Sequence, residues 1–296
     1  MNYSISALRF FLMATTALVC AELAQAQEPP QPKNHYGSIV PFGKAVDAPK
    51  KPIFNWAGFH IGIGGGGVLM RANSSVHSHV SQGAYNPNYG NYFESYAVNQ
   101  SINRSVSKAG GFGTLSLGYD AVVGSTLFGG FADLNLQDVS AHASTVDTTP
   151  SSVGGGPDLP ATATLSHKIG LGASVDIGAR LGLLASERTL VYALAGASFA
   201  QIDAKSTIGV QHDASSALSN FSLTTETNVW RPGFTVGAGV EYMLTENVSL
   251  QTEYRYADYG KIKSQKAVTL IDGTATIDQA DSVSEQTIRA VLSYHF

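Results

Sequence analysis

Residues 284–296 read S-E-Q-T-I-R-A-V-L-S-Y-H-F, and this stretch decides the fold of the chain. One set of alternate positions is apolar: Ile288, Ala290, Leu292, Tyr294 and Phe296. The other set is polar except for Val291: Thr287, Arg289, Val291, Ser293 and His295. Because successive side chains of a strand point to opposite faces, the stretch predicts a β-strand with one apolar face and one polar face.

The same alternation recurs upstream, so the sequence predicts eight strands in all. The other seven are residues 56–69, 108–119, 127–137, 168–181, 190–202, 231–243 and 248–257. The segment 168–181 alternates most regularly, with Ile169 and Ile177 on its apolar face and Lys168 on its polar face. Alanine and glycine dominate residues 190–202, so no face can be assigned to that strand.

The connections between these strands alternate in length. Those near residues 120–126, 184–188 and 244–247 are short, and those near 70–107, 138–166, 203–229 and 258–282 are long and polar. Short periplasmic turns and long external loops are typical of outer-membrane barrels, and closure removes the unpaired edges that lipid does not tolerate. We therefore expect an all-β fold, an eight-stranded antiparallel transmembrane β-barrel with four long extracellular loops.

A soluble β-sandwich or lipocalin-like barrel is the alternative, and it places the apolar face inside. Two features favour lipid on the apolar face. Glycine is concentrated on the polar face, where a narrow lumen needs small residues. Aromatic residues lie near the strand ends, as in interfacial girdles: Trp56, Phe59, Tyr119, Tyr242, Tyr254, Tyr256, Tyr294 and Phe296.

Composition excludes several classes of protein. The chain has 31 glycines and 14% charged residues, with a mean hydropathy of +0.02. That is too polar for a helical membrane protein, and no run of about 20 apolar residues is present. A net charge of −4 disfavours a general nucleic-acid binder, which needs a basic surface.

The N-terminal residues predict export. Residues 1–26 have the pattern of a signal peptide, with Arg9, an apolar core and cleavage after Ala26. The single cysteine, Cys20, lies inside this segment, so thiol chemistry is excluded in the mature protein. Residues 27–55 hold six of the 11 prolines and predict an extended periplasmic linker before the barrel of residues 56–296. A plain tether and a peptidoglycan contact both remain open for it.

Two parts of the sequence resemble a known family. Residues 54–62, F-N-W-A-G-F-H-I-G, resemble the first strand of the small outer-membrane barrels of alphaproteobacteria. Residues 235–242 (T-V-G-A-G-V-E-Y) and 253–260 (E-Y-R-Y-A-D-Y-G) resemble the penultimate hairpin of that family, and Phe296 resembles its terminal assembly signal. The family includes the 25 and 31 kDa class surface proteins of brucellae and the haemin-binding proteins of bartonellae. The resemblance implies an OmpA-like, opacity-type barrel, outer-membrane lipid around it and the barrel-assembly machinery as a partner of Phe296.

The lumen is the best-supported candidate site, because charged residues recur on the polar faces of the strands. They are Asp133, Lys168, Asp176, Arg180, Glu241, Glu253, Arg255 and Arg289. An eight-stranded barrel has room inside for side chains and little else, so opposite charges can pair and plug it. A narrow ion path or gated, porin-like pore is the functional alternative.

Haem is the only cofactor that the residues suggest. The segment near 70–107 carries His77, His79, Tyr85 and Tyr89, with Tyr92 and Tyr96 following. Histidine and tyrosine ligate haem iron, and the resemblance to haemin-binding proteins favours this interpretation, although both residues are also common on exposed loops. His60 is phased towards the lumen, where a hydrogen-bonding role is expected.

Two enzymatic patterns fail. Gly62, Gly64 and Gly67 match a dinucleotide fingerprint, but they lie within a strand with no helix behind them. His295 and Ser293 have no acid at suggestive spacing, and G-x-S-x-G is absent from the sequence. We therefore expect no enzyme and no metal site. The expected function is a structural one, in which the barrel supports envelope integrity and surface contacts with host molecules or haemin.

Overall fold

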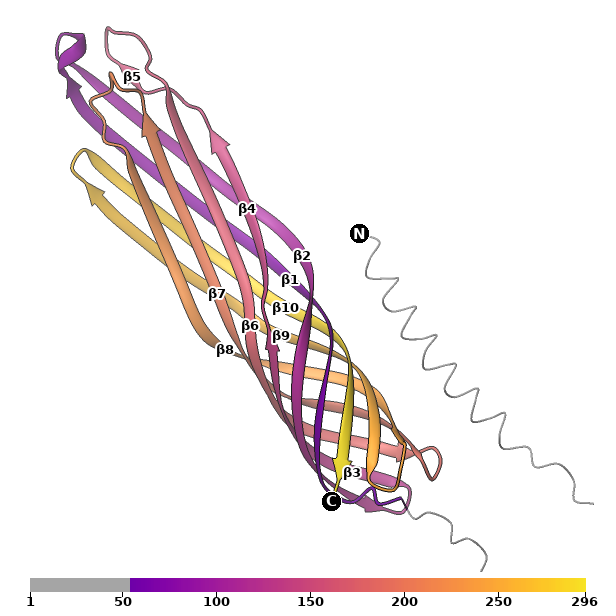
Figure 1. Cartoon of the computed structure of the whole chain (residues 1–296). Coiled ribbons are helices and arrows are strands. Elements are labelled where there is room, and N and C mark those ends of the chain that lie inside the picture. The colour runs from indigo at the N-terminus through magenta and orange to yellow at the C-terminus, as the bar shows by residue number, and fades with distance from the viewer. Residues whose placement is uncertain (1–53) are drawn as a thin grey trace, which may run out of the picture. The chain divides into compact units, whose positions relative to one another are not determined.

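The computed structural model describes residues 54–296. The predicted signal peptide and nearly all of the predicted linker lie outside this range. Within it, eight long strands are joined edge to edge into a closed antiparallel ring (Figure 1). Their order around the ring is β1, β10, β9, β8, β7, β6, β3 and β2, with β1 also paired to β2. No helix among the described residues is long and apolar enough to cross a membrane.

The ring strands contain all eight predicted segments, so the predicted fold class is confirmed. Their bounds are β1 (Gly58–Asn86), β2 (Tyr92–Val123), β3 (Thr126–Gln137), β6 (Ala161–Leu184), β7 (Thr189–His212), β8 (Phe221–Met243), β9 (Val248–Leu270) and β10 (Gly273–His295). The short elements are η1 (Pro87–Tyr89), β4 (Val139–Asp147) and β5 (Ser152–Val153). The chain's C-terminus lies at the same end as the tight β2–β3 turn (Figure 1).

The strands continue far into the segments expected to be long loops. β1 and β2, for example, stay paired from Gly58 and Asp120 up to Asn86 and Tyr92. Serine and asparagine in these segments were interpreted as loop residues, but they alternate with buried valines such as Val76. They form the water-facing side of strands, and the loops are confined to the hairpin tips.

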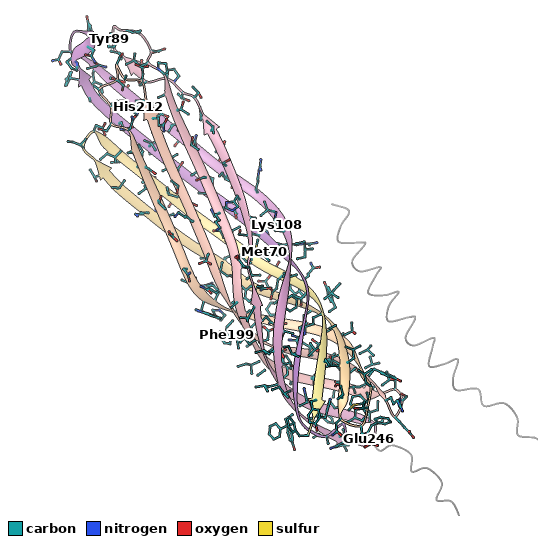
Figure 2. The ribbon with its side chains drawn as sticks, viewed as in Figure 1. Met70, Tyr89, Lys108, Phe199, His212 and Glu246 are labelled. Carbon is teal, nitrogen blue, oxygen red and sulfur yellow. The ribbon has the colours of Figure 1, made fainter. Side chains whose placement is uncertain are left out.

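The environment of the outer face therefore changes along each strand. Near the turn end of β1, Ile61 and Ile63 are 48% and 65% exposed on the outside. Further along, beyond Met70 (Figure 2), Val76 and Val80 point inward and are fully buried. We call the first part the membrane band (residues 57–67, 111–137, 173–200, 233–258 and 285–296). The second part is the extension (residues 68–110, 138–172, 201–232 and 259–284).

The extension has the architecture of a sandwich. The β8–β9 ladder ends at Phe234 and Asp258, next to a bulge at Gly260, whose φ of +67° favours glycine. The β2–β3 ladder ends at Phe112, and beyond it β4 pairs with β6. The ring thus opens into two sheets, β9-β10-β1-β2 and β4-β6-β7-β8, and the short β5 pairs with β2 near the tip. In the extension the apolar side chains face inward, as the soluble alternative predicts. In the membrane band they face outward, as the transmembrane barrel predicts.

Two apolar clusters fill the space between the sheets of the extension. The one next to the membrane band is built around Met70, Ile169, Leu171, Ile202 and Tyr259. The one towards the tip includes Val76, Val80, Leu165, Ile208 and Ile277. Burial of these side chains is the ordinary hydrophobic stabilisation of a soluble domain.

Three assignments made from the sequence are corrected by the structure. A bulge between Leu171 and Ser174 shifts the phase of β6, so Ile169 and Leu171 point inward and Lys168 points outward to water. Strict alternation cannot anticipate this, because one extra residue reverses every facing beyond it. Trp56 is buried at the turn end, where its Nε1 donates to the Glu187 carbonyl, and does not belong to a lipid-facing girdle.

The structure shows which side chains of residues 190–202 face inward and which face outward, which the sequence does not predict. Tyr192, Leu194 and Ser198 point into the lumen, and the alternate positions, mostly alanine, face outward. Phe199 is the outward aromatic near the top of the band on this strand (Figure 2). Alanine faces lipid here, which is why the apolar pattern was ambiguous.

The change of environment along one strand predicts a difference between two substitutions in β6. Ile177→Arg places a charge on the lipid face and should lower the free energy of unfolding by about 2–4 kcal/mol. Thr164→Arg, outward on the same strand in the extension, should change it by no more than about 0.5 kcal/mol. Urea unfolding in phospholipid vesicles measures both. Equal effects of the two substitutions would contradict the assigned membrane band.

Candidate functional site

The lumen of the membrane band holds a continuous network of buried charges. Its first tier, next to the turns, is centred on Arg180 of β6. Arg180 Nε donates to Asp120 of β2 at 3.0 Å, and its NH1 donates to Glu241 of β8 at 2.9 Å. His60 Nε2 lies 3.3 Å from Asp120, and His295 Nε2 lies 3.1 Å from Glu241. All five side chains are at most 5% exposed, so the tier is sealed from water.

The second tier joins four strands of the barrel wall, β3, β7, β9 and β10. Arg289 of β10 donates to Glu253 of β9 at 2.6 Å and to Asp133 of β3 at 2.8 Å. Arg255 lies 2.7 Å from the same Asp133 oxygen and donates to Glu253 at 2.8 Å. Tyr192 of β7 also donates to Glu253, at 2.5 Å. Each carboxylate therefore bridges two guanidinium groups, which is the arrangement that offsets the cost of burying charge.

A third tier connects the network to the extension. Asp176 of β6 lies 3.4 Å from Arg255 and accepts hydrogen bonds from Asn135 and Ser198. Above it, the Tyr259 hydroxyl donates to Glu285 at 2.6 Å. Pairs that cross the lumen tie strands from opposite parts of the ring, so the network both fills the barrel and braces it.

The structure brings together seven of the eight predicted lumen charges, and Lys168 is the exception. Asp120, Tyr192 and Glu285 also belong to the network and were missed. The sequence predicts a turn at Asp120. In the structure, Ser116, Gly118 and Asp120 are alternate residues of β2 and all face the lumen. Tyr192 lies on the strand that could not be phased from the sequence.

The predicted haem ligands do not converge. His77 and His79 lie on the outer face of β1, both exposed, and His79 Nδ1 contacts the Asn99 amide oxygen at 2.8 Å. Tyr85, 66% exposed, is eight residues further along the strand than His77, or about 26 Å. Tyr89 lies at the tip of the hairpin (Figure 2). Across residues 54–296, no group of three or more metal-ligating side chains is placed to hold an ion.

A serine–histidine–aspartate cluster lies between the two apolar clusters of the extension. His167 Nδ1 contacts Ser206 Oγ at 2.8 Å, and its Nε2 contacts Ser74 Oγ and Asp281 Oδ1, each at 3.1 Å. These are the residue types of a hydrolytic triad. All four are at most 7% exposed and are enclosed by apolar side chains above and below, so the cluster stabilises the sandwich interior and no substrate reaches it.

The tip of the extension is held by a second buried carboxylate. Glu94 of β2 accepts hydrogen bonds from Asn86 of β1, from Ser151 after β4, and from Ser216 and the Ala217 amide between β7 and β8. Burial raises the pKa of Glu94, but these hydrogen bonds outweigh it and hold the pKa below the ordinary value. The Glu94 side chain thereby joins, by hydrogen bonds, the β1–β2, β4–β6 and β7–β8 connections at the tip of the two sheets.

Comparison with known proteins gives a consistent result. A family model described as "Outer membrane protein beta-barrel domain" matches residues 11–296. The "31 kDa outer-membrane immunogenic protein" of Brucella melitensis is 33% identical over 120 residues, which is 40% of this chain. The protein of the same description from Brucella suis matches equally. The chain spans 44% of the length of these two relatives.

Solved structures of similar chains are outer-membrane proteins. OprG from Pseudomonas aeruginosa is 11% identical, with 81% of this chain and 97% of that chain covered and a TM-score of 0.35. Neisserial surface protein A is 13% identical, with 77% and 97% covered and a TM-score of 0.30.

The second tier predicts that replacing one of its carboxylates by an uncharged side chain greatly lowers the free energy of unfolding. Glu253→Leu removes a carboxylate partner from both Arg255 and Arg289 and should lower the free energy of unfolding by about 3–5 kcal/mol. Tyr192→Phe removes one hydrogen bond to the same carboxylate and should cost about 1 kcal/mol. Urea unfolding in vesicles separates the two. A loss below 1 kcal/mol for Glu253→Leu would mean that the lumen is solvated.

The tip predicts a pH dependence. Because the pKa of Glu94 is lowered by folding, its contribution is complete above the ordinary glutamate pKa of about 4.3 and is lost as the pH falls through the folded value. Hydrogen exchange of the Ala217 amide, corrected for its intrinsic rate, should show lost protection on acidification. Glu94→Gln is the control and should remove the dependence. Loss of protection at the same pH in the wild type and in Glu94→Gln would contradict the assignment.

Proposed function

This chain belongs to the outer membrane protein β-barrel family, and on that premise we propose that it is a closed-lumen anchor that holds a rigid β-extension at the cell surface. The observation that carries the proposal is the buried ion-pair network at the level of the lipid-facing residues. Buried, mutually paired charges leave no water-filled path for a solute, because an eight-stranded barrel has room only for its own side chains.

The orientation follows from the two unequal ends of the molecule. Tight turns connect β2 to β3, β6 to β7 and β8 to β9 at the end where the chain terminates. The extension occupies the other end. Outer-membrane barrels carry their short turns in the periplasm, so we place the turns there and the extension outside the cell. Phe296, outward and 68% exposed beside Tyr294, is then available to the assembly machinery at the periplasmic face.

The extension supports a surface role more than a catalytic one. Its outer face is polar strand and its interior is packed like a soluble sandwich, so it stands rigidly above the lipid. The cluster at His167 is enclosed and serves packing. Contacts with surface molecules and a contribution to envelope integrity are the functions that such a projection supports.

Haemin capture is the second candidate, and one observation favours it: His77 and His79 are both exposed on the same outer face of β1, two residues apart. A saturable Soret shift on titration of haemin into the refolded protein, weakened by replacing both histidines with alanine, would support it. No saturable shift would remove this candidate and leave the anchor proposal unaffected.

A closed lumen predicts that the barrel does not conduct ions. The refolded wild-type protein, inserted into a planar bilayer, should give no stepwise conductance, because the paired arginines and carboxylates block ion entry. Insertion is verified separately by protease protection of the membrane band. Reproducible steps whose size changes in Arg289→Lys would show that ions pass through the network and would replace the anchor with a channel.

A further inference from the structure

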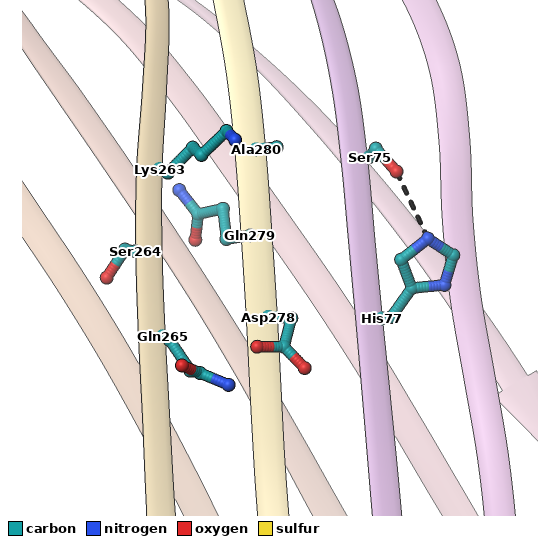
Figure 3. A pocket seen from close by; sticks show the side chains of 8 residues that line it. All are labelled: Ser75, His77, Lys263, Ser264, Gln265, Asp278, Gln279 and Ala280. Atoms are coloured by element: carbon teal, nitrogen blue, oxygen red, sulfur yellow. Dashed lines mark hydrogen bonds between the residues drawn. The ribbon is translucent and has the colours of Figure 1, made fainter.

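The outer face of one sheet of the extension is hollowed into a shallow trough. Three adjoining hollows, of about 470, 450 and 230 Å³, follow β1 and β10 from the band upward. The first two share Ser75, Lys263 and Ala280, and the last two share His77 and Asp278, so the three form one continuous depression. Figure 3 shows its middle part, with Lys263 on β9, Asp278 on β10, and Ser75 contacting His77 on β1.

Strand register defines the floor of the trough as four rows of outward residues. From the band upward they are Ser105-Asn73-Ser282-Lys261, Asn103-Ser75-Ala280-Lys263, Ser101-His77-Asp278-Gln265 and Asn99-His79-Thr276-Ala267. Rows two residues apart are about 7 Å apart, so the floor is about 20 Å long. No row contains a phenylalanine, tyrosine, tryptophan or large aliphatic side chain. The depression at its centre exists because Ala280, between Ser75 and Lys263, is small.

The chemistry of this floor excludes some ligands. β1 and β10 are paired on both sides, so no backbone groups are free to bind a peptide by strand addition. An acyl chain finds no apolar wall. The hydroxyl, amide and imidazole groups instead match the hydroxyls of a saccharide, and several are already aligned, as when Ser75 donates to Asn103 at 2.7 Å and Ser105 donates to Asn73 at 2.6 Å.

The charges indicate an anionic group at the lower end of the trough. Lys261 and Lys263 line it there from β9, and Arg104 lines the same hollow from β2, across β1 and β10. Within residues 54–296 none of the three forms an ion pair, whereas Lys205 on the other sheet pairs with Glu226 at 3.3 Å. Cations without partners beside a polar hollow favour a phosphate or carboxylate.

The position of the trough selects among anionic saccharides. Its lowest row, Asn73 and Ser282, lies six residues beyond the membrane band on β1 and three on β10, which is about 10–20 Å along the strands. That is the level to which the saccharide headgroups of surrounding glycolipids project. We propose that the trough holds the phosphorylated saccharide headgroup of an outer-leaflet glycolipid, with Lys261 and Lys263 on phosphate and the serine, asparagine and histidine side chains on sugar hydroxyls. The inference rests on the proposed outward orientation of the extension.

The test is a titration of phosphorylated core oligosaccharide, released from lipopolysaccharide by deacylation, into the mature protein refolded in detergent micelles. Saturable binding is expected, weakened about tenfold or more by Lys263→Glu, which loses a charge-assisted contact, and by Ser75→Trp, which fills the hollow. Lys168→Glu and Ser166→Trp make the same changes on the outer face of the other sheet and should leave affinity unchanged. Heat-modifiable gel mobility verifies that each variant is folded.

Three results would overturn the proposal: no saturable binding, equal weakening by the trough and control variants, or equal affinity for the enzymatically dephosphorylated oligosaccharide. Dextran sulfate is titrated in parallel as a soluble polyanion. If it occupies the trough and the oligosaccharide does not, the occupant is a free polyanion and the glycolipid assignment is wrong. The titration requires neither a membrane nor a silent lumen, so its failure is distinguishable from failure of the closed-lumen proposal.

Discussion

In the hydrocarbon core of a membrane, each backbone N–H and C=O must find its partner within the protein, and this requirement governs both the ring and its lumen. Strands can meet it only by closing into a ring, as β1 and β2 do here. Eight strands enclose a lumen too narrow for bulk water, so every polar side chain that alternation sends inward must also be paired. The tiers around Arg180, Arg255 and Arg289 are the consequence, since each guanidinium group meets carboxylates from other strands.

Above the lipid the constraint is relaxed, and the same strands solve a different problem. Water can satisfy the exposed edges, so the β8–β9 ladder ends at Phe234 and Asp258 and the ring opens into two sheets. The interior fills with valine, isoleucine and leucine, and the outer face becomes serine, asparagine and lysine. The geometry of the strands is the same in both parts. The outer face is apolar where it meets lipid and polar where it meets water, and the inner face is the reverse. A membrane anchor and a soluble sandwich are thereby built from one continuous set of strands.

Alternation in the sequence predicts much of this, because it reports facing directly. The terminal stretch is confirmed in detail: Leu292, Tyr294 and Phe296 are about half exposed or more, while Arg289 and His295 are buried. Alternation cannot report a bulge, and the one between Leu171 and Ser174 reverses Lys168 and Ile169. Alternation also cannot distinguish a polar strand from a polar loop. The strands of the extension are therefore predicted as loops from the sequence. The partners across the lumen, such as Asp120 for Arg180, follow from ring closure and leave no trace in local spacing.

One outer face thus meets lipid in the membrane band and water in the extension. Spin labels placed singly along β1 at Ile61, Ile63, Asn73 and His77 test it directly, by the relaxation that oxygen and a water-soluble nickel chelate cause in vesicle-inserted protein. Labels at Ile61 and Ile63 are expected to respond to oxygen, and labels at Asn73 and His77 to nickel. A nickel response at Ile61 and Ile63, or an oxygen-dominated response at His77, would contradict it.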